Sequence, residues 1–162
     1  MRELFDNLPR ISLQDNCDFL IDSCFFVWIF EKNKEKEFER VLEKSICAIT
    51  SFNADELAHI SHRLNDKVRE SARKELKKSE HLFLLDVPVK PGNKMEEIEF
   101  VKRIVPEFNC VEHDPSDAVI LAAAVSTGAN VLTRDKHDLF NARMANCLNR
   151  YSIKVLNTFE RV

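Results

Sequence analysis

The segment from residue 114 to residue 138 constrains the fold more than any other part of the chain. It begins with an aspartate and Pro115, which are typical of the start of a helix, and small apolar residues continue to Gly128, where a helix can end. A short apolar run then predicts a strand, and more carboxylates follow it. Such a helix–strand unit can bring Asp117 and Asp135 to the same edge of a sheet.

The rest of the chain alternates in the same way. Strands are predicted at 18–22, 82–85, 131–133 and 153–156, and residues 46–50 are either a further strand or an apolar lead-in. Helices are predicted at 23–30, 34–44, 53–63, 66–79, 96–105, 114–127 and from 139 onward. Strands that alternate with helices predict an α/β fold with a parallel, doubly wound sheet. We expect residues 18–162 to form a single domain, with Ser23 capping its first helix. Residues 1–17 are expected to be an N-terminal extension with little structure of its own.

Composition excludes several classes of protein. The chain has 162 residues, enough for one domain with a real core. Its two glycines form no Gly-rich phosphate loop, and its five cysteines form no Cys-x-x-Cys pair, which argues against a zinc ribbon. We expect Cys24 and Cys47 to be buried. The longest apolar stretch is too short to span a membrane, and the N-terminus lacks the apolar core of a secretory signal, so a cytoplasmic location is expected.

Three carboxylates stand where strands end or a helix begins. Asp22 follows the first predicted strand, and open parallel sheets bind ligands beyond such strand ends, although a helix cap is an equal alternative. Asp117 lies in the first turn of its helix, where the helix dipole stabilises a negative charge by about 0.3–1 kcal/mol. Asp135 follows a strand and Thr133, whose hydroxyl could orient a ligand or a water molecule.

A fourth carboxylate comes from the helix predicted at 53–63. Glu56 lies three residues after Asn53, so a structural capping box is a serious alternative to a functional role. We rank Glu56 above its neighbour Asp55 because Glu56 adjoins the apolar face of the helix and so leans toward the sheet. Four carboxylates that converge would repel one another unless a divalent cation neutralised them, which predicts metal-dependent chemistry on a polyanion.

With these acids in this order, the chain resembles the PIN-domain nucleases from Phe19 to Leu156. The segments 19–23 and 116–135 carry the resemblance most sharply. It implies a three-layer α/β/α sandwich with a central parallel sheet, and endoribonuclease activity with Mg²⁺ or Mn²⁺. Many small members of this family resemble the VapC-type toxins of toxin–antitoxin pairs. Besides the RNA substrate, the resemblance therefore suggests an antitoxin protein and a second copy of the chain as partners, and no membrane.

The resemblance also suggests roles for individual residues. It assigns the catalytic and metal-binding positions to Asp22, Glu56, Asp117 and Asp135, with Asp138 as a further metal ligand. Arg134 and Lys136 flank the fourth acid and, with Thr133, are the candidates for substrate contacts. One or two cations held there would lower the pKa of a bound water and polarise the scissile phosphate.

Two other functions remain open at this point. A Mg²⁺-dependent phosphotransfer or phosphatase domain also uses aspartates at strand ends, but Asp22 is followed by Ser23 and Cys24 rather than by the usual Asp-x-Asp motif. The other is a non-catalytic PIN-like module that binds RNA or protein. The presence of four acids argues against that loss of activity.

Overall fold

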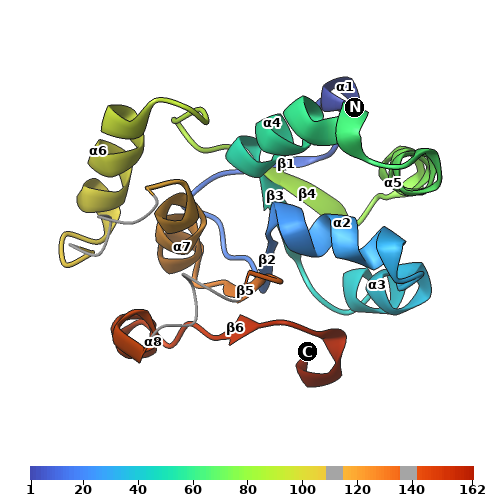
Figure 1. The fold of residues 1–162 in the computed structure, drawn as a ribbon. Helices are drawn as coiled ribbons and strands as arrows, with labels where there is room; N and C mark the ends of the chain where they lie inside the picture. The colour runs from blue at the N-terminus through green and yellow to red at the C-terminus, as the bar shows by residue number, and fades with distance from the viewer. Residues whose placement is uncertain (109–114, 136–141) are drawn as a thin grey trace.

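A six-stranded parallel sheet forms the centre of the molecule. The computed structural model describes residues 1–108, 115–135 and 142–162. The strands are β1 (Arg10–Ile11), β2 (Phe19–Ile21), β3 (Cys47–Thr50), β4 (Leu82–Leu85), β5 (Asn130–Leu132) and β6 (Val155–Leu156). They lie in the order β1-β4-β3-β2-β5-β6, and every neighbouring pair is parallel (Figure 1).

Helices cover both faces of this sheet. They are α1 (Arg2–Asp6), α2 (Ser23–Glu31), α3 (Glu35–Leu42), α4 (Ser51–Ile60), α5 (Asp66–Lys78), α6 (Lys94–Ile104), α7 (Pro115–Thr127) and α8 (Ala142–Arg150), with two short 3-10 turns, η1 (Ser61–Arg63) and η2 (Phe159–Arg161). Helices α1 to α5 lie on one side of the sheet and α6 to α8 on the other (Figure 1). The predicted three-layer α/β/α sandwich with a central parallel sheet is confirmed.

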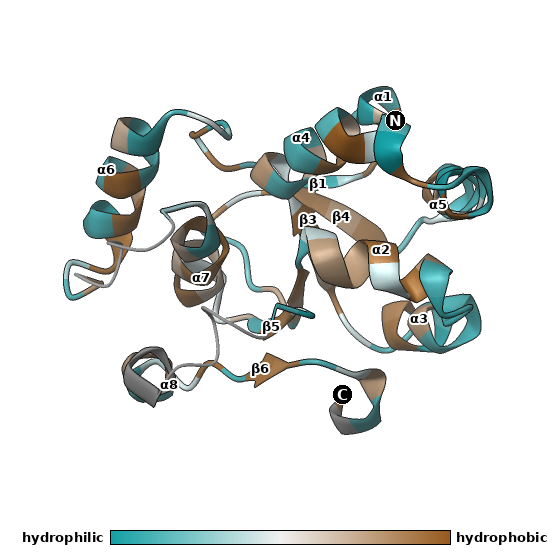
Figure 2. Cartoon of the chain, viewed as in Figure 1, coloured by the Kyte–Doolittle hydropathy of each residue, from teal (hydrophilic) through white to brown (hydrophobic). Residues whose placement is uncertain are grey.

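The central strands are almost entirely apolar, with Thr50 at the end of β3 as the polar exception, because both of their faces are covered. Every residue of β2 and β3 is buried. Strands of parallel sheets between two helical layers have this continuous composition, whereas half-exposed strands alternate polar and apolar residues. Figure 2 shows the same distribution, with hydrophobic colour on the strands and hydrophilic colour on the outer surfaces of α3 and α5.

The two faces of the sheet are packed with side chains of very different size. The α1–α5 face is rich in phenylalanine, and Phe5, Phe25 and Phe38 are fully buried there. The opposite face has the small residues of α7, and Ala122 to Ala124 are also fully buried. Because alanine side chains are short, α7 can pack closely against β2 and β5, which it contacts.

The N-terminal segment is part of the packed fold, so the expectation that residues 1–17 have little structure of their own is wrong. Helix α1 buries Phe5, and Leu8 is buried just after it. Strand β1 then pairs with β4 at the edge of the sheet, with Arg10 opposite Leu84. Met1, Leu4, Phe5 and Leu8 recur at helical spacing in and around α1, but a five-residue helix and a two-residue strand are too short for a clear sequence signal.

Two predicted helix caps differ from the structure. The cap of α2 is Asp22, whose carboxylate accepts a hydrogen bond from Ser23 N, so Ser23 is the first helical residue rather than the cap. The cap of α4 is Thr50, whose hydroxyl accepts from Asn53 N. Asn53 therefore lies inside α4, and it does not form the predicted capping box with Glu56.

None of the helices in the described residues combines the length and the apolar composition needed to cross a membrane.

Candidate active site

The candidate site lies where the chain changes direction across the sheet. From β2 the chain adds β3 and β4 on one side, and it later returns to the other side of β2 as β5. Ile21 is opposite Leu132 in the β2–β5 pair, so Asp22 and Thr133 leave the sheet as neighbours. Open α/β sheets bind ligands at the carboxyl ends of strands at such a switch point.

Asp22 is held by four hydrogen-bond donors. Its Oδ1 accepts from Ser23 N at 2.8 Å and from Asn53 Nδ2 at 3.2 Å. Its Oδ2 accepts from Thr133 Oγ1 at 2.7 Å and from Cys24 Sγ at 2.8 Å. These donors come from α2, α4 and the residue after β5, so they fix the carboxylate in one orientation at the point where three elements meet.

Glu56 is joined to Asp22 through shared donors. Its Oε2 accepts from Ser23 Oγ at 2.8 Å and from Asn53 Nδ2 at 3.1 Å. Asn53 and Glu56 are three residues apart on α4, so both face α2. The structure thus brings Asp22 and Glu56 together across the α2–α4 contact.

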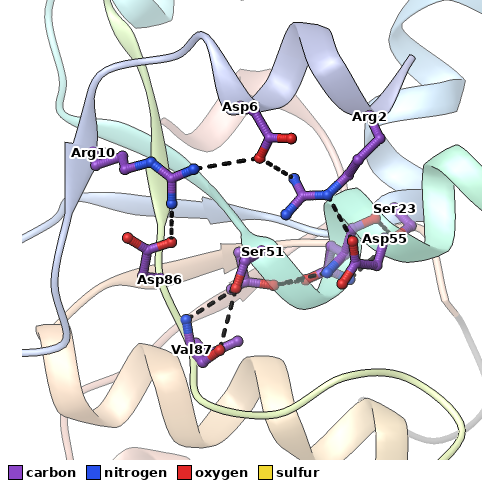
Figure 3. Close-up of polar contacts among 10 residues, drawn as sticks. Arg2, Asp6, Arg10, Ser23, Ser51, Asp55, Asp86 and Val87 are labelled. Carbon is purple, nitrogen blue, oxygen red and sulfur yellow. Dashed lines mark hydrogen bonds and ion pairs between the residues drawn. The ribbon is translucent and has the colours of Figure 1, made fainter.

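The alternative second acid, Asp55, is engaged elsewhere. Its Oδ1 forms an ion pair with Arg2 Nε at 2.6 Å, and Arg2 also pairs with Asp6 at 3.3 Å. Figure 3 shows this chain of ion pairs continuing from Asp6 through Arg10 to Asp86. Because Asp55 is turned toward the N-terminal helix, the geometry favours Glu56 as the second acid of the site.

Cys24 is exposed, so the expectation that it is buried is wrong, whereas Cys47 is buried as expected. The Cys24 thiol lies 3.3 Å from Thr133 Oγ1, and it accepts from Arg134 N at 3.2 Å. Desolvation of the sulfur and then the charge of Asp22 raise the pKa of the Cys24 thiol to about 11. The thiol therefore keeps its proton near neutral pH and remains a donor to Asp22.

Asp117 and Asp135 are positioned by the α7–β5 unit. Helix α7 spans Pro115–Thr127, and the chain turns at Gly128 with a φ of 71° before β5 begins. The helix is about 18 Å long, so its N-terminal end, which contains Asp117, lies that far from Gly128 and toward the carboxyl edge of the sheet. Asp135 follows β5 at that edge, and its backbone N–H donates to Thr133 Oγ1 at 3.1 Å. Both aspartates are half-buried.

Of the remaining predicted site residues, the structure describes Arg134 but not Lys136 or Asp138. Asp138 and Lys136 lie outside the described residues, as does Leu139, where a helix was expected to begin. Arg134 is engaged with the C-terminal segment: its Nη1 donates to Asn157 O at 2.7 Å, and its guanidinium lies 4.9 Å from the centre of the Trp28 ring.

The donor chemistry of the site suits a hard cation. Asp22 and Glu56 offer carboxylate oxygens, and Thr133 adds a hydroxyl, which are the donor types that Mg²⁺ and Mn²⁺ prefer. As the side chains stand, no group of three or more histidine, cysteine, aspartate and glutamate residues among those described is arranged to hold a metal ion. The residues fit such a cation by chemical type, and Asp22 and Glu56 are the two acids that accept hydrogen bonds from the same Asn53 amide.

A groove opens beside the two acids. Its volume is about 970 Å³, and it is lined by Ser23, Cys24, Val27, Glu31, Asp55, Glu56, His59, Ile60, Leu64, Lys90, Pro91 and Gly92. Lys90 to Gly92 belong to the segment between β4 and α6. Glu97 of α6 is 1% exposed, and its carboxylate accepts from Gly92 N at 3.0 Å and from Ser116 Oγ at 3.3 Å. This buried carboxylate links the groove to the first turn of α7, beside Asp117.

Sequence reasoning missed two residues of this neighbourhood. The sequence favours Asn53 as a helix cap, although its three-residue spacing from Glu56 places both on one face of a helix. Glu97 was not distinguished from the other glutamates of α6, because burial of a charged residue leaves no mark in the sequence.

Comparisons with known proteins agree with this architecture. A search of curated protein sequences finds no match. Among solved structures, the chain is similar to a chain of VapBC2 from Rickettsia felis, bound to a DNA fragment from their promoter, with 15% identity and a TM-score of 0.56. That match covers 86% of this chain and 97% of the other, and it shows a shared fold. The family model of the PIN domain matches residues 19–143, so the chain belongs to the PIN-domain family, which is a family of nucleases.

Proposed function

We propose that this protein is a metal-dependent endoribonuclease that cleaves RNA phosphodiester bonds with Mg²⁺ or Mn²⁺. The observation that carries the proposal is the Asp22–Glu56 pair, joined through Ser23 and Asn53 at the switch point between β2 and β5. Two carboxylates held side by side at that edge are a ready anchor for a divalent cation.

Each acid has a stated role in this proposal. Asp22 and Glu56 hold the first cation, Asp117 and Asp135 complete the site from the α7–β5 side, and Asp138 is a further ligand. A bound cation supplies a water of lowered pKa and neutralises charge on the scissile phosphate. Thr133 orients Asp22 through its 2.7 Å hydrogen bond, and the Cys24 thiol holds the same oxygen. No side chain of the site has to form a covalent intermediate.

Substrate contacts come from cations beside the acids. Within the part of the chain that the structure describes, Arg134 donates one N–H group to Asn157 O, and a guanidinium has five such groups. Its remaining N–H groups are proposed to contact an RNA phosphate, together with Lys136. Lys90 lines the groove next to Glu56 and adds positive charge to its wall.

We further propose that the protein acts in the cytoplasm, either as a toxin neutralised by an antitoxin protein or as an RNA-processing enzyme. The fold similarity to a chain of a VapBC2 complex supports the first of these settings. A homodimer is also proposed.

Cleavage of single-stranded RNA tests the proposal directly. With Mn²⁺ we expect the wild-type chain to cut the RNA, and we expect chelator, Asp22→Asn and Asp117→Asn each to abolish the cutting. Asp66→Asn is the matched control, since Asp66 is an exposed acid of α5 that pairs with Arg69. RNA binding without any cutting by the wild type would overturn the proposal in favour of a binding module. Phosphate release from a small phosphoester without RNA cleavage would favour a phosphatase.

A further inference from the structure

We propose that Asn53 is a positioning residue, whose side-chain amide holds Asp22 and Glu56 in the relative arrangement that a shared cation requires. This inference rests on the proposed nuclease function and adds a residue to it. Asn53 would not touch the metal ion or the RNA. It would act through the two carboxylates.

The side chain of Asn53 lies between the two acids. Asn53 is 3% exposed, and its Nδ2 is 3.2 Å from Asp22 Oδ1 and 3.1 Å from Glu56 Oε2. The same nitrogen is 3.0 Å from Ser23 Oγ, which itself donates to Glu56. One amide therefore contacts both carboxylates and the hydroxyl that joins them.

The orientation of this amide is set by Thr50. The Thr50 hydroxyl accepts from Asn53 N at 3.0 Å, so its proton is available to Asn53 Oδ1, which lies 2.6 Å away. The amide oxygen thus faces Thr50, and the amide NH₂ faces the acids. The opposite orientation would place an oxygen against two carboxylates, which is unfavourable.

Removing the amide donor has a defined physical consequence. Asp22 would keep its donors from Ser23 N, Cys24 and Thr133, whereas Glu56 would lose one of the two donors, Asn53 Nδ2 and Ser23 Oγ, that link it to Asp22. Repulsion between the two carboxylates would then favour conformations of Glu56 that point away from Asp22. A cation would have to bring Glu56 back before binding. Losses of tenfold to a hundredfold are typical when such supporting groups around a metal site are removed.

Two variant pairs test the inference in the full chain. Asn53→Leu keeps the volume of the side chain but removes its donors. Thr50→Val removes the hydroxyl that orients the amide, whereas Thr50→Ser retains it. Asn65→Ala is the control, because the Asn65 side chain caps α5 by accepting from Val68 N, so we expect its loss to lower stability only.

The readouts are the Mn²⁺ dissociation constant from calorimetry, kcat and KM for RNA cleavage, and the melting temperature. For Asn53→Leu we expect the Mn²⁺ dissociation constant to rise by about tenfold to a hundredfold and kcat to fall, with KM changed less than about threefold. Thr50→Val should show a smaller rise, and Thr50→Ser should restore Mn²⁺ affinity. Asn65→Ala should lower the melting temperature and leave Mn²⁺ affinity unchanged.

The outcomes separate this inference from the function on which it rests. If the wild type neither binds Mn²⁺ nor cuts RNA, the proposed function fails, and the inference fails with it. If the wild type cuts RNA and Asn53→Leu binds Mn²⁺ as tightly as the wild type, the function stands and the positioning role is overturned. If Asn53→Leu does not fold, the Thr50 pair decides, because equal Mn²⁺ affinity in Thr50→Val and Thr50→Ser overturns the role.

Discussion

The acidic edge of the sheet has two halves that are positioned by different means. In the α2–α4 half, which comprises Asp22, Ser23, Asn53 and Glu56, side-chain hydrogen bonds of 2.8 to 3.2 Å join neighbouring helices. In the α7–β5 half, which comprises Asp117, Thr133 and Asp135, position follows from the packing of an alanine-rich helix and from strand register. The first half should therefore be sensitive to loss of polar neighbours, and the second to changes in volume beneath it.

An enlarged side chain on α7 should have the largest effect on the second half. Ala123 of α7 is fully buried, so Ala123→Leu should displace the helix and reduce the free energy of unfolding by about 1–3 kcal/mol. A displacement of about 1 Å at Asp117 should lower RNA cleavage on the order of a hundredfold. Denaturation in urea and cleavage rates at a temperature where the variant is folded would measure both effects.

The matched control for that variant is Ser126→Leu, an exposed position on the same helix. If Ala123→Leu cleaved RNA at the wild-type rate, the packing of α7 would not set the position of Asp117. The proposed difference between the two halves would then be wrong.

Loss of the Thr133 hydroxyl should have an intermediate effect, because this group joins the two halves. It donates to Asp22 Oδ2 at 2.7 Å and accepts from Asp135 N at 3.1 Å. Thr133→Val keeps the shape but not the hydroxyl, and cleavage should fall by about tenfold to a hundredfold. Thr133→Ser should retain most of the activity. Equal rates in the Val and Ser variants would show that the halves act independently.

Arg134→Ala should have the smallest effect on stability. The guanidinium lies over Trp28, and contacts of this kind contribute about 0.5–1 kcal/mol at exposed sites. Trp28 is the only tryptophan of the chain, so its fluorescence reports the loss of this contact. If Arg134 also contacts RNA phosphate, KM should rise in low salt and the difference from the wild type should shrink as salt increases. A KM that matches the wild type at every salt concentration would limit Arg134 to its contact with the C-terminal segment.

Much of the architecture could be predicted because it depends on local patterns. The apolar run at 82–85 coincides with β4, and the alternation of strands and helices gave the correct fold class. The carboxyl ends of parallel strands meet at one edge, so strand order was not needed to expect Asp22 and Asp135 on the same side.

The features that were missed depend on tertiary neighbours. Residues 10–11 form a strand because β4 offers an unpaired edge. A two-residue segment is too short for its sequence to predict that pairing. The caps of α2 and α4 depend on the backbone conformations of Asp22 and Thr50. Cys24 follows a buried strand, but the first turn of α2 carries it out toward solvent.

Strand β1 has a practical consequence for anyone who prepares this protein. The family-matched region begins at residue 19, which invites a shortened version that omits β1. Such a version would leave the outer backbone N–H and C=O groups of β4 without their β1 partners. Exposed strand edges of this kind promote aggregation, because they can pair with strands of other molecules. The shortened version would also remove the Phe5 ring from the interior. A preparation that retains residues 1–18, with any purification tag at the C-terminus, keeps β1 paired with the edge of β4.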